Sequence, residues 1–217
     1  MLINKLAIFI TFTTTLALSE IKAREATAGD LALQRWGGIY NKNARYIGNI
    51  RYSSIEDFNA GEIPLWLSTV NMMNTGADEV SLYADEFEKY RAELESPLSE
   101  HESTEIAKAY KSFCEKQCKY FGKLVSLRTI LKGLEKAPYF HEFENNIDAC
   151  LANVDGAQIQ LYVSMKEAIS ADKLKVQESK AILLNLNSAH DTFALSIMRA
   201  VSAWRDRPEP APCSRAV

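Results

Sequence analysis

Cysteines, blocks of basic residues and long apolar runs are all scarce in this sequence. The four cysteines lie at or after Cys114, which excludes a lipid-modified cysteine near the start of the chain. The 25 basic residues are scattered among 28 acidic ones, so the chain lacks the basic patch that nucleic acids or anionic lipids require. The apolar run over residues 6–18 contains four threonines and is shorter than the about 20 residues that span a bilayer. We therefore expect neither a nucleic-acid partner nor a stable membrane span.

The sequence signatures of common enzymes are missing as well. The chain has no G-x-S-x-G, no H-E-x-x-H, no P-loop and no dinucleotide-binding glycine pattern. Its acidic residues alternate with basic ones at helical spacing, which is typical of a solvated helix face rather than of two converging catalytic carboxylates. We favour a non-enzymatic protein that needs no cofactor and no metal.

Residues 1–23 have the pattern of a secretory signal, because Lys5 precedes the apolar run. The small residues of Ala17–Ser19 and Ala23 offer alternative cleavage sites, so we expect cleavage between residues 19 and 24. An uncleaved anchor is the competing interpretation, which the short apolar run disfavours. We predict an exported protein, in a bacterial periplasm first and secreted second.

The rest of the chain divides into one domain and a tail. Residues 24–207 are enough for a single hydrophobic core and contain no internal repeat. Residues 208–217 are rich in proline, which predicts an extended C-terminal tail.

The longest helical pattern covers residues 99–136. Ser99 and Glu102 form a capping-box pattern at its start, and Pro138 excludes helix beyond its end. Acidic residues cluster in its first turns and basic residues in its last, which suits the helix dipole. A helix this long is too large to decorate another fold, so we expect it to be central to the core.

Further helices are expected on both sides of it. The apolar spacing predicts a short helix over 64–73, a longer one over 75–96 that starts with a second capping box, and two more over 143–169 and 172–204. Gly156 could kink or divide the third of these. The predicted fold class is all-α, an up-down bundle of about four main helices with an irregular N-terminal segment.

Residues 29–74 are the least regular part of the chain. A small hairpin around residues 41–44 is one interpretation, although the alternation of apolar and polar residues is poor, and a helix-loop-helix wrap over the bundle is the other. Aromatic residues and arginines are enriched here, a composition typical of protein-binding surfaces. The predicted partner-binding surface consists of Trp36, Tyr40, Arg45, Tyr46, Arg51 and Tyr52.

The cysteines of an exported chain are expected to form disulfides. Cys114 and Cys118 lie one helical turn apart, where their Cβ atoms are about 5 to 6 Å apart, against about 3.8 Å in a relaxed disulfide. We therefore predict that one of them joins Cys150 and the other joins Cys213. Which cysteine of the pair takes which partner stays open.

Two chemical alternatives compete with this structural role. Cys114 and Cys118 on one helix face could hold a soft metal ion, although a lone thiol pair is a weak signal. His190 lies beside Asp191 and near Ser188, which invites comparison with a hydrolytic triad. Adjacent residues on a helix point apart, so we interpret His190 as a histidine at the core or its boundary.

The leading functional hypothesis combines these observations. It is an exported, non-enzymatic helical protein that binds another protein as an adaptor, inhibitor, immunity factor or secretion-system component. A bundle that binds a small ligand or soft metal through Cys114 and Cys118 is the first alternative, and a hydrolase centred on His190 is the second.

Overall fold

The computed structural model describes residues 33, 35, 37–45, 47, 49, 67–93, 98–133, 135–137, 140–170 and 176–205. The predicted signal peptide, its cleavage site and the proline-rich tail lie outside these residues. So do Trp36, Tyr46, Arg51, Tyr52 and Cys213. None of the described helices is both long enough and apolar enough to cross a membrane.

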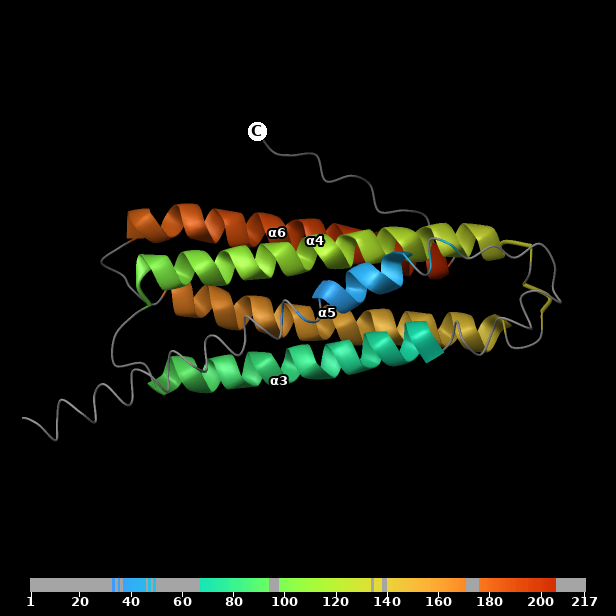
Figure 1. Ribbon diagram of the computed structural model, residues 1–217, viewed down its shortest axis with the longest axis horizontal. Helices are drawn as coiled ribbons and strands as arrows, with labels where there is room; N and C mark the ends of the chain where they lie inside the picture. Colours follow the sequence, from blue (N-terminus) through green and yellow to red (C-terminus); the bar gives the residue numbers. More distant parts are fainter. Residues whose placement is uncertain are drawn as a thin grey trace, which may run out of the picture.

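The prediction of an all-α fold is confirmed for the described residues. A short π-helical turn, η1 (Leu67–Asn71), runs directly into α3 (Met72–Glu93). Three further long helices follow, which are α4 (Glu100–Leu131), α5 (Phe140–Ser170) and α6 (Val176–Trp204). Figure 1 shows that the four long helices lie side by side and alternate in direction.

The helices that pack most closely are not consecutive in the sequence. The main packing partner of α4 is α6, that of α3 is α5, and α5 also packs against α6. The colours in Figure 1 show that α4 and α6 run in the same direction, as do α3 and α5. The long helices therefore pack in the order α3, α5, α6 and α4, with α3 and α4 at the two ends of this order.

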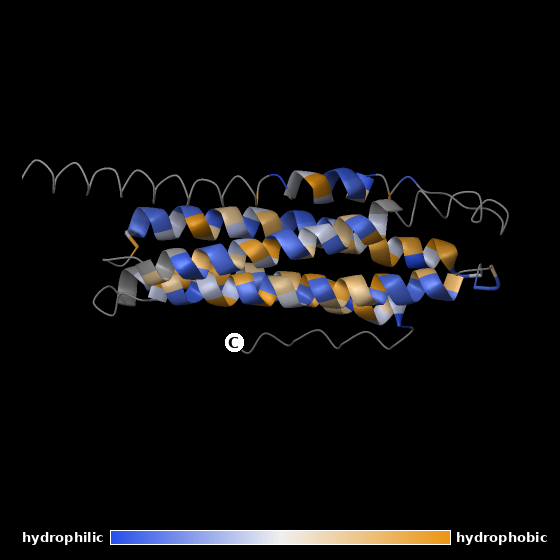
Figure 2. Ribbon diagram, turned by 90° about the horizontal axis from the view of Figure 1, so that it is seen from below, coloured by the Kyte–Doolittle hydropathy of each residue, from blue (hydrophilic) through white to orange (hydrophobic). Residues whose placement is uncertain are grey.

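The N-terminal helical segment, residues 37–45, lies over the bundle between α3 and α4 (Figures 1 and 2). Tyr40 is only 1% exposed, and its ring makes edge contacts with Phe113, Tyr120 and Phe121 of α4 at centroid distances of 5.9, 5.3 and 6.4 Å. At Gly37 the segment lies close to the side chain of Lys116 on α4. An added Cβ would be 2.7 Å from that side chain, so a larger residue at this position would have to displace the lysine.

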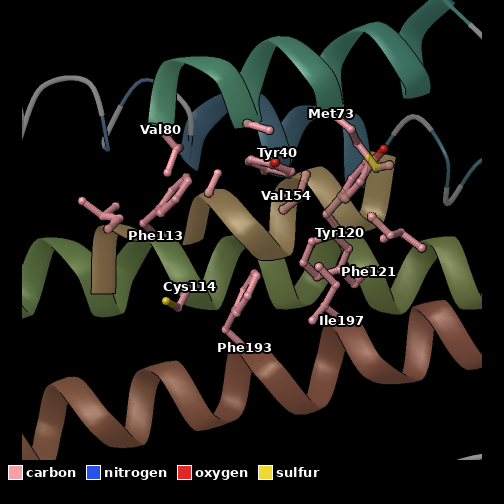
Figure 3. Close-up of a cluster of buried hydrophobic side chains, with 14 of the residues drawn as sticks. Tyr40, Met73, Val80, Phe113, Cys114, Tyr120, Phe121, Val154, Phe193 and Ile197 are labelled. Atoms are coloured by element: carbon pink, nitrogen blue, oxygen red, sulfur yellow. The ribbon is translucent and has the colours of Figure 1, made fainter. Parts of the chain in front are cut away.

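Two predictions for this segment are corrected by its structure. The hairpin around residues 41–44 is wrong because these residues are helical, as the alternative of a helical wrap required. Tyr40 is a core residue and not part of a surface, because the helix points it between α3 and α4 (Figure 3). Arg45, on the same segment, is exposed.

The helix ends follow local signals, with some differences. The capping box at Ser99 is confirmed, since its Oγ accepts the N–H of Glu102 at 3.2 Å and its own N–H donates to the Glu102 carboxylate at 2.8 Å. The helix ends at Leu131, earlier than predicted, because Gly133 adopts a positive φ of 101°. Gly156 does not divide α5.

The second predicted capping box, at residue 75, is wrong. Helix α3 already begins at Met72 and follows η1 without a break, so the pattern lies inside a helix. The apolar face formed by Val70, Met72 and Met73 continues that of residues 77–87, and burying both on α5 favours one continuous helix over two short ones.

The predicted disulfide between Cys150 and α4 is not formed, because Cys114, Cys118 and Cys150 are all free thiols. Gln158 donates to the Cys114 sulfur at 3.4 Å, so Gln158 of α5 and Cys114 of α4 lie at the same height along the bundle axis. Cys150 comes eight residues before Gln158 and so lies about 12 Å further along the axis. Its thiol donates instead to the carbonyl of Val70 in η1 at 3.7 Å.

Candidate functional site

Three long helices meet around His190. Its Nδ1 atom is 3.0 Å from the hydroxyl of Tyr110 on α4, and this hydroxyl and the imidazole share a hydrogen bond. Its ring stacks on that of Tyr162 on α5, with a centroid distance of 3.9 Å and an interplanar angle of 3°. The Tyr162 hydroxyl donates to Asn187, one turn before His190 on α6, at 2.8 Å. His190 is thus held on two sides by aromatic side chains.

Burial dominates the electrostatics of this cluster. It lowers the pKa of His190, although the nearby carboxylates of Asp191 and Asp155 act in the opposite direction and Lys166 lowers the pKa further. Burial also raises the pKa of Asp155, which His190 partly offsets. At neutral pH the imidazole is therefore uncharged, which suits its place between two aromatic rings.

The surroundings of His190 do not resemble a hydrolytic site. Its hydrogen-bond partner is Tyr110, whereas the side chains of Ser188 and Asp191 are exposed on α6. Burial also raises the pKa of Tyr110 far above its ordinary value, so this phenol stays protonated. A triad needs the imidazole between a hydroxyl and a carboxylate, and here it lies between two tyrosines.

Cys114 and Cys118 point to different places. Cys114 is buried against Gln158, whereas the thiol of Cys118 donates to the carbonyl of Thr192 on α6 at 3.7 Å. Burial raises the pKa of both thiols, which opposes the thiolate form that a soft metal binds. In the part of the chain that the structure describes, no three His, Cys, Asp or Glu side chains are grouped closely enough to hold a metal ion.

A charged network closes the end of the bundle near the turn between α4 and α5. Arg128 pairs with Glu135 at 3.3 Å and with Glu144 at 3.1 Å, and its guanidinium lies 5.2 Å from the centre of the Phe140 ring. Backbone N–H groups, including that of Gly133, lower the pKa of Glu135, and Arg128 adds to this effect. Arg128 thus already has two carboxylate partners, and its ion pairs join the end of α4 to the start of α5.

A groove runs along the outside of the bundle between α4 and α6. Its floor is made of small side chains. Two of the floor residues hold the helices together, because the hydroxyl of Ser196 on α6 donates to the carbonyl of Cys118 on α4 at 3.4 Å. Gly122 leaves open space above this floor, since an added Cβ would meet no atom within 4 Å. We call this feature the α4–α6 groove, and its lining residues are Cys118, Gly122, Val125, Thr192, Leu195, Ser196 and Arg199.

Among the described residues, the large apolar side chains that are exposed are Leu82 on α3 and four residues on α5 and α6. Ile159 and Val163 on α5 are 45% and 41% exposed, and Leu184 and Met198 are exposed on α6. Asp155 is the one charged residue between positions 149 and 165.

The predicted partner surface is not assembled by the described residues. Tyr40 is in the core, Arg45 is exposed, and the other four members lie outside the described residues. Residues 149–165 of α5 contain a single charged residue, which is few for a helix with a solvent-exposed face. Comparison of the chain with protein-family models, curated proteins and solved structures found no match.

Proposed function

We propose that the mature chain is an exported, non-enzymatic helical bundle that binds another protein, and that the α4–α6 groove holds an amphipathic helix of that partner. The observation that carries this proposal is the shape of the groove. It has a floor of small residues between two long helices and lacks the converging ionisable groups that catalysis would need.

The spacing of the groove residues suits a helix. On α4, Cys118, Gly122 and Val125 repeat at intervals of four and three residues, so they form one stripe about 10 Å long. That length matches two turns of a partner helix, whose large apolar residues would enter the groove at the same intervals. The open space above Gly122 accommodates one such side chain.

Charge defines the partner further. Among the described residues that line the groove, Arg199 is the one with a charged side chain, and it is exposed. Leu195 and Val125 form apolar sides nearby and are half-buried. The partner helix is therefore expected to combine apolar residues with a carboxylate near Arg199, because a cation beside an apolar contact favours an opposite charge.

The first experiment tests where the partner binds. A photo-reactive amino acid replaces Leu195 in the exported protein in its own host, and the cross-linked partner is identified and purified. Its affinity is then measured for the wild type, for Gly122→Leu and for Gly38→Leu. Gly38 is the matched control, because it is also an exposed helical glycine with open space around it.

Gly122→Leu fills the groove and is expected to weaken binding at least tenfold, while Gly38→Leu leaves the affinity unchanged. Leucine is a better helix former than glycine, so neither variant should unfold the protein. Equal affinities of all three proteins would overturn the assignment of the groove. A robust turnover by the purified protein, abolished by substitutions in a defined cleft, would overturn the non-enzymatic function.

Export is tested separately by the intact mass of the protein recovered from its host. The proposal expects a mature chain whose first residue lies between positions 20 and 24. An intact N-terminal segment would contradict it.

A further inference from the structure

Helix α5 carries an uncharged stripe on its outer face. We call it the α5 stripe, and its residues are Ala149, Ala152, Gly156, Ile159 and Val163. All five are exposed, and they recur at intervals of three and four residues, the spacing with which one helix packs along another. The stripe is thus a helix-packing surface without a described helix on it.

Contacts to the neighbouring helices show which way the stripe faces. On one edge of α5, Asn153 hydrogen-bonds Asn74 of α3 at 3.1 Å. On the other edge, Tyr162 stacks on His190 of α6. The α5 stripe lies between these edges and on the opposite side of the helix from buried Val154, so it points out of the bundle.

We propose that a second copy of this chain covers the α5 stripe, in a symmetric dimer whose two α5 helices cross antiparallel at Gly156. The order of side-chain sizes is the first reason. Gly156 is in the middle, two alanines lie on one side of it, and Ile159 and Val163 lie on the other. A twofold axis at Gly156 places Ala152 opposite Ile159, and Ala149 opposite Val163.

This arrangement fits small side chains against large ones along the whole stripe. Two glycines meet at the crossing point, where the absence of side chains allows the backbones to approach closely. A parallel arrangement would instead set alanine against alanine and leave a gap in the contact. The size pattern therefore favours an antiparallel copy of the same helix.

Charge complementarity is the second reason. Asp148 and Lys166 are 18 residues apart, which is five full turns, so they lie on the same edge of the α5 stripe. Both are near α6, since Asp148 pairs with Arg205 and the Lys166 ammonium lies over the Tyr162 ring. They are also at similar distances from Gly156. In an antiparallel pair, Lys166 of one copy comes near Asp148 of the other, where it shares the carboxylate with Arg205, and symmetry repeats the contact.

On the opposite edge of the α5 stripe, two carboxylates from different copies would repel each other at the rim of the proposed interface. Glu142 of one copy faces the region of Glu167 of the other, where solvent screens the interaction. This feature provides a sensitive test of the geometry, because Glu142→Lys converts repulsion into attraction. That variant is expected to strengthen the dimer, whereas a different arrangement of the copies would not respond in this way.

The first measurement is the mass of the mature protein in solution, by light scattering and sedimentation from about 1 to 100 µM. The wild type is expected to form dimers, and Gly156→Leu is expected to be monomeric with an unchanged helical spectrum. Position 156 has no atom within 4 Å of an added Cβ, so the substitution is compatible with the fold. Gly38→Leu is the matched control and should stay dimeric. A wild type that is monomeric at 100 µM would overturn the proposal.

Cysteine cross-linking tests the antiparallel geometry directly. Gly156→Cys lies at the twofold axis and is expected to form a covalent dimer under mild oxidation. The two copies of position 149 would be about 21 Å apart along the helices, so Ala149→Cys should cross-link only when mixed with Val163→Cys. Efficient cross-linking of Ala149→Cys alone would refute the crossing at Gly156.

The dimer and the partner-binding function fail independently. The α5 stripe and the α4–α6 groove belong to different faces, so monomeric Gly156→Leu is expected to bind the partner through the groove. Loss of dimerisation with retained partner binding separates the two surfaces.

Discussion

Tyr40→Ala is expected to be among the most destabilising single substitutions in the described part of the chain. The side chain is 1% exposed and contacts three aromatic rings of α4. Truncating a fully buried aromatic side chain to alanine costs about 3 to 5 kcal/mol in unfolding free energy. Among the described residues in and beside this segment, the other buried large or small apolar side chains are Leu33, Ala44 and Ile47, so few neighbours are available to fill the cavity.

Tyr40→Phe separates the ring from its hydroxyl. The ring contacts are kept, but the hydroxyl interacts with the side chain of Gln117, which is itself buried and already has one oxygen without a partner. Removing the hydroxyl leaves a second buried polar group unpaired, which costs about 1 to 3 kcal/mol. We expect Tyr40→Phe to be destabilising, but clearly less so than Tyr40→Ala.

The assay is equilibrium unfolding in urea, followed by circular dichroism and by tryptophan fluorescence. Arg45→Ala is the control, because Arg45 is exposed on the same segment and its substitution should change stability by less than about 0.5 kcal/mol. Hydrogen exchange of α4 should become faster in Tyr40→Ala. A loss below about 1 kcal/mol for Tyr40→Ala would refute the conclusion that this segment is part of the core.

Three further predictions concern the helix cap, the buried histidine and the thiols. Ser99→Ala removes the capping oxygen and is expected to lower the unfolding free energy by about 0.5 to 2 kcal/mol in urea titrations. Burial lowers the pKa of His190, so the unfolded chain binds a proton at higher pH than the native one. Its contribution to stability is complete above pH 6.5 and is lost as the pH falls toward the native pKa; His190→Gln should flatten this pH dependence of unfolding, and His141→Gln, at an exposed position, should not. A thiol reagent should label partly exposed Cys118 before buried Cys114 in the folded protein, and mapping a disulfide to either residue would contradict their free state.

The helices themselves were largely determined by local sequence. The capping box at Ser99, the break around Pro138 and the end at Trp204 depend on residues only a few positions apart, and all three are seen in the structure. Apolar residues at helical spacing identified the buried side of each long helix for the same reason. A local signal misleads when a longer apolar face overrides it, as with the capping pattern at residue 75 inside α3.

Which helix lies beside which was decided by the tertiary structure. An apolar helix face indicates that a residue is buried but not against what, so the sequence allowed Cys150 to face α4 when it actually faces η1. The same limit made Tyr40 a surface candidate, although it fills the space between α3 and α4. The α4–α6 groove also depends on two helices that are distant in sequence. Periodicity within a helix follows from the chain itself, whereas the pairing of helix faces depends on how all of the side chains pack together.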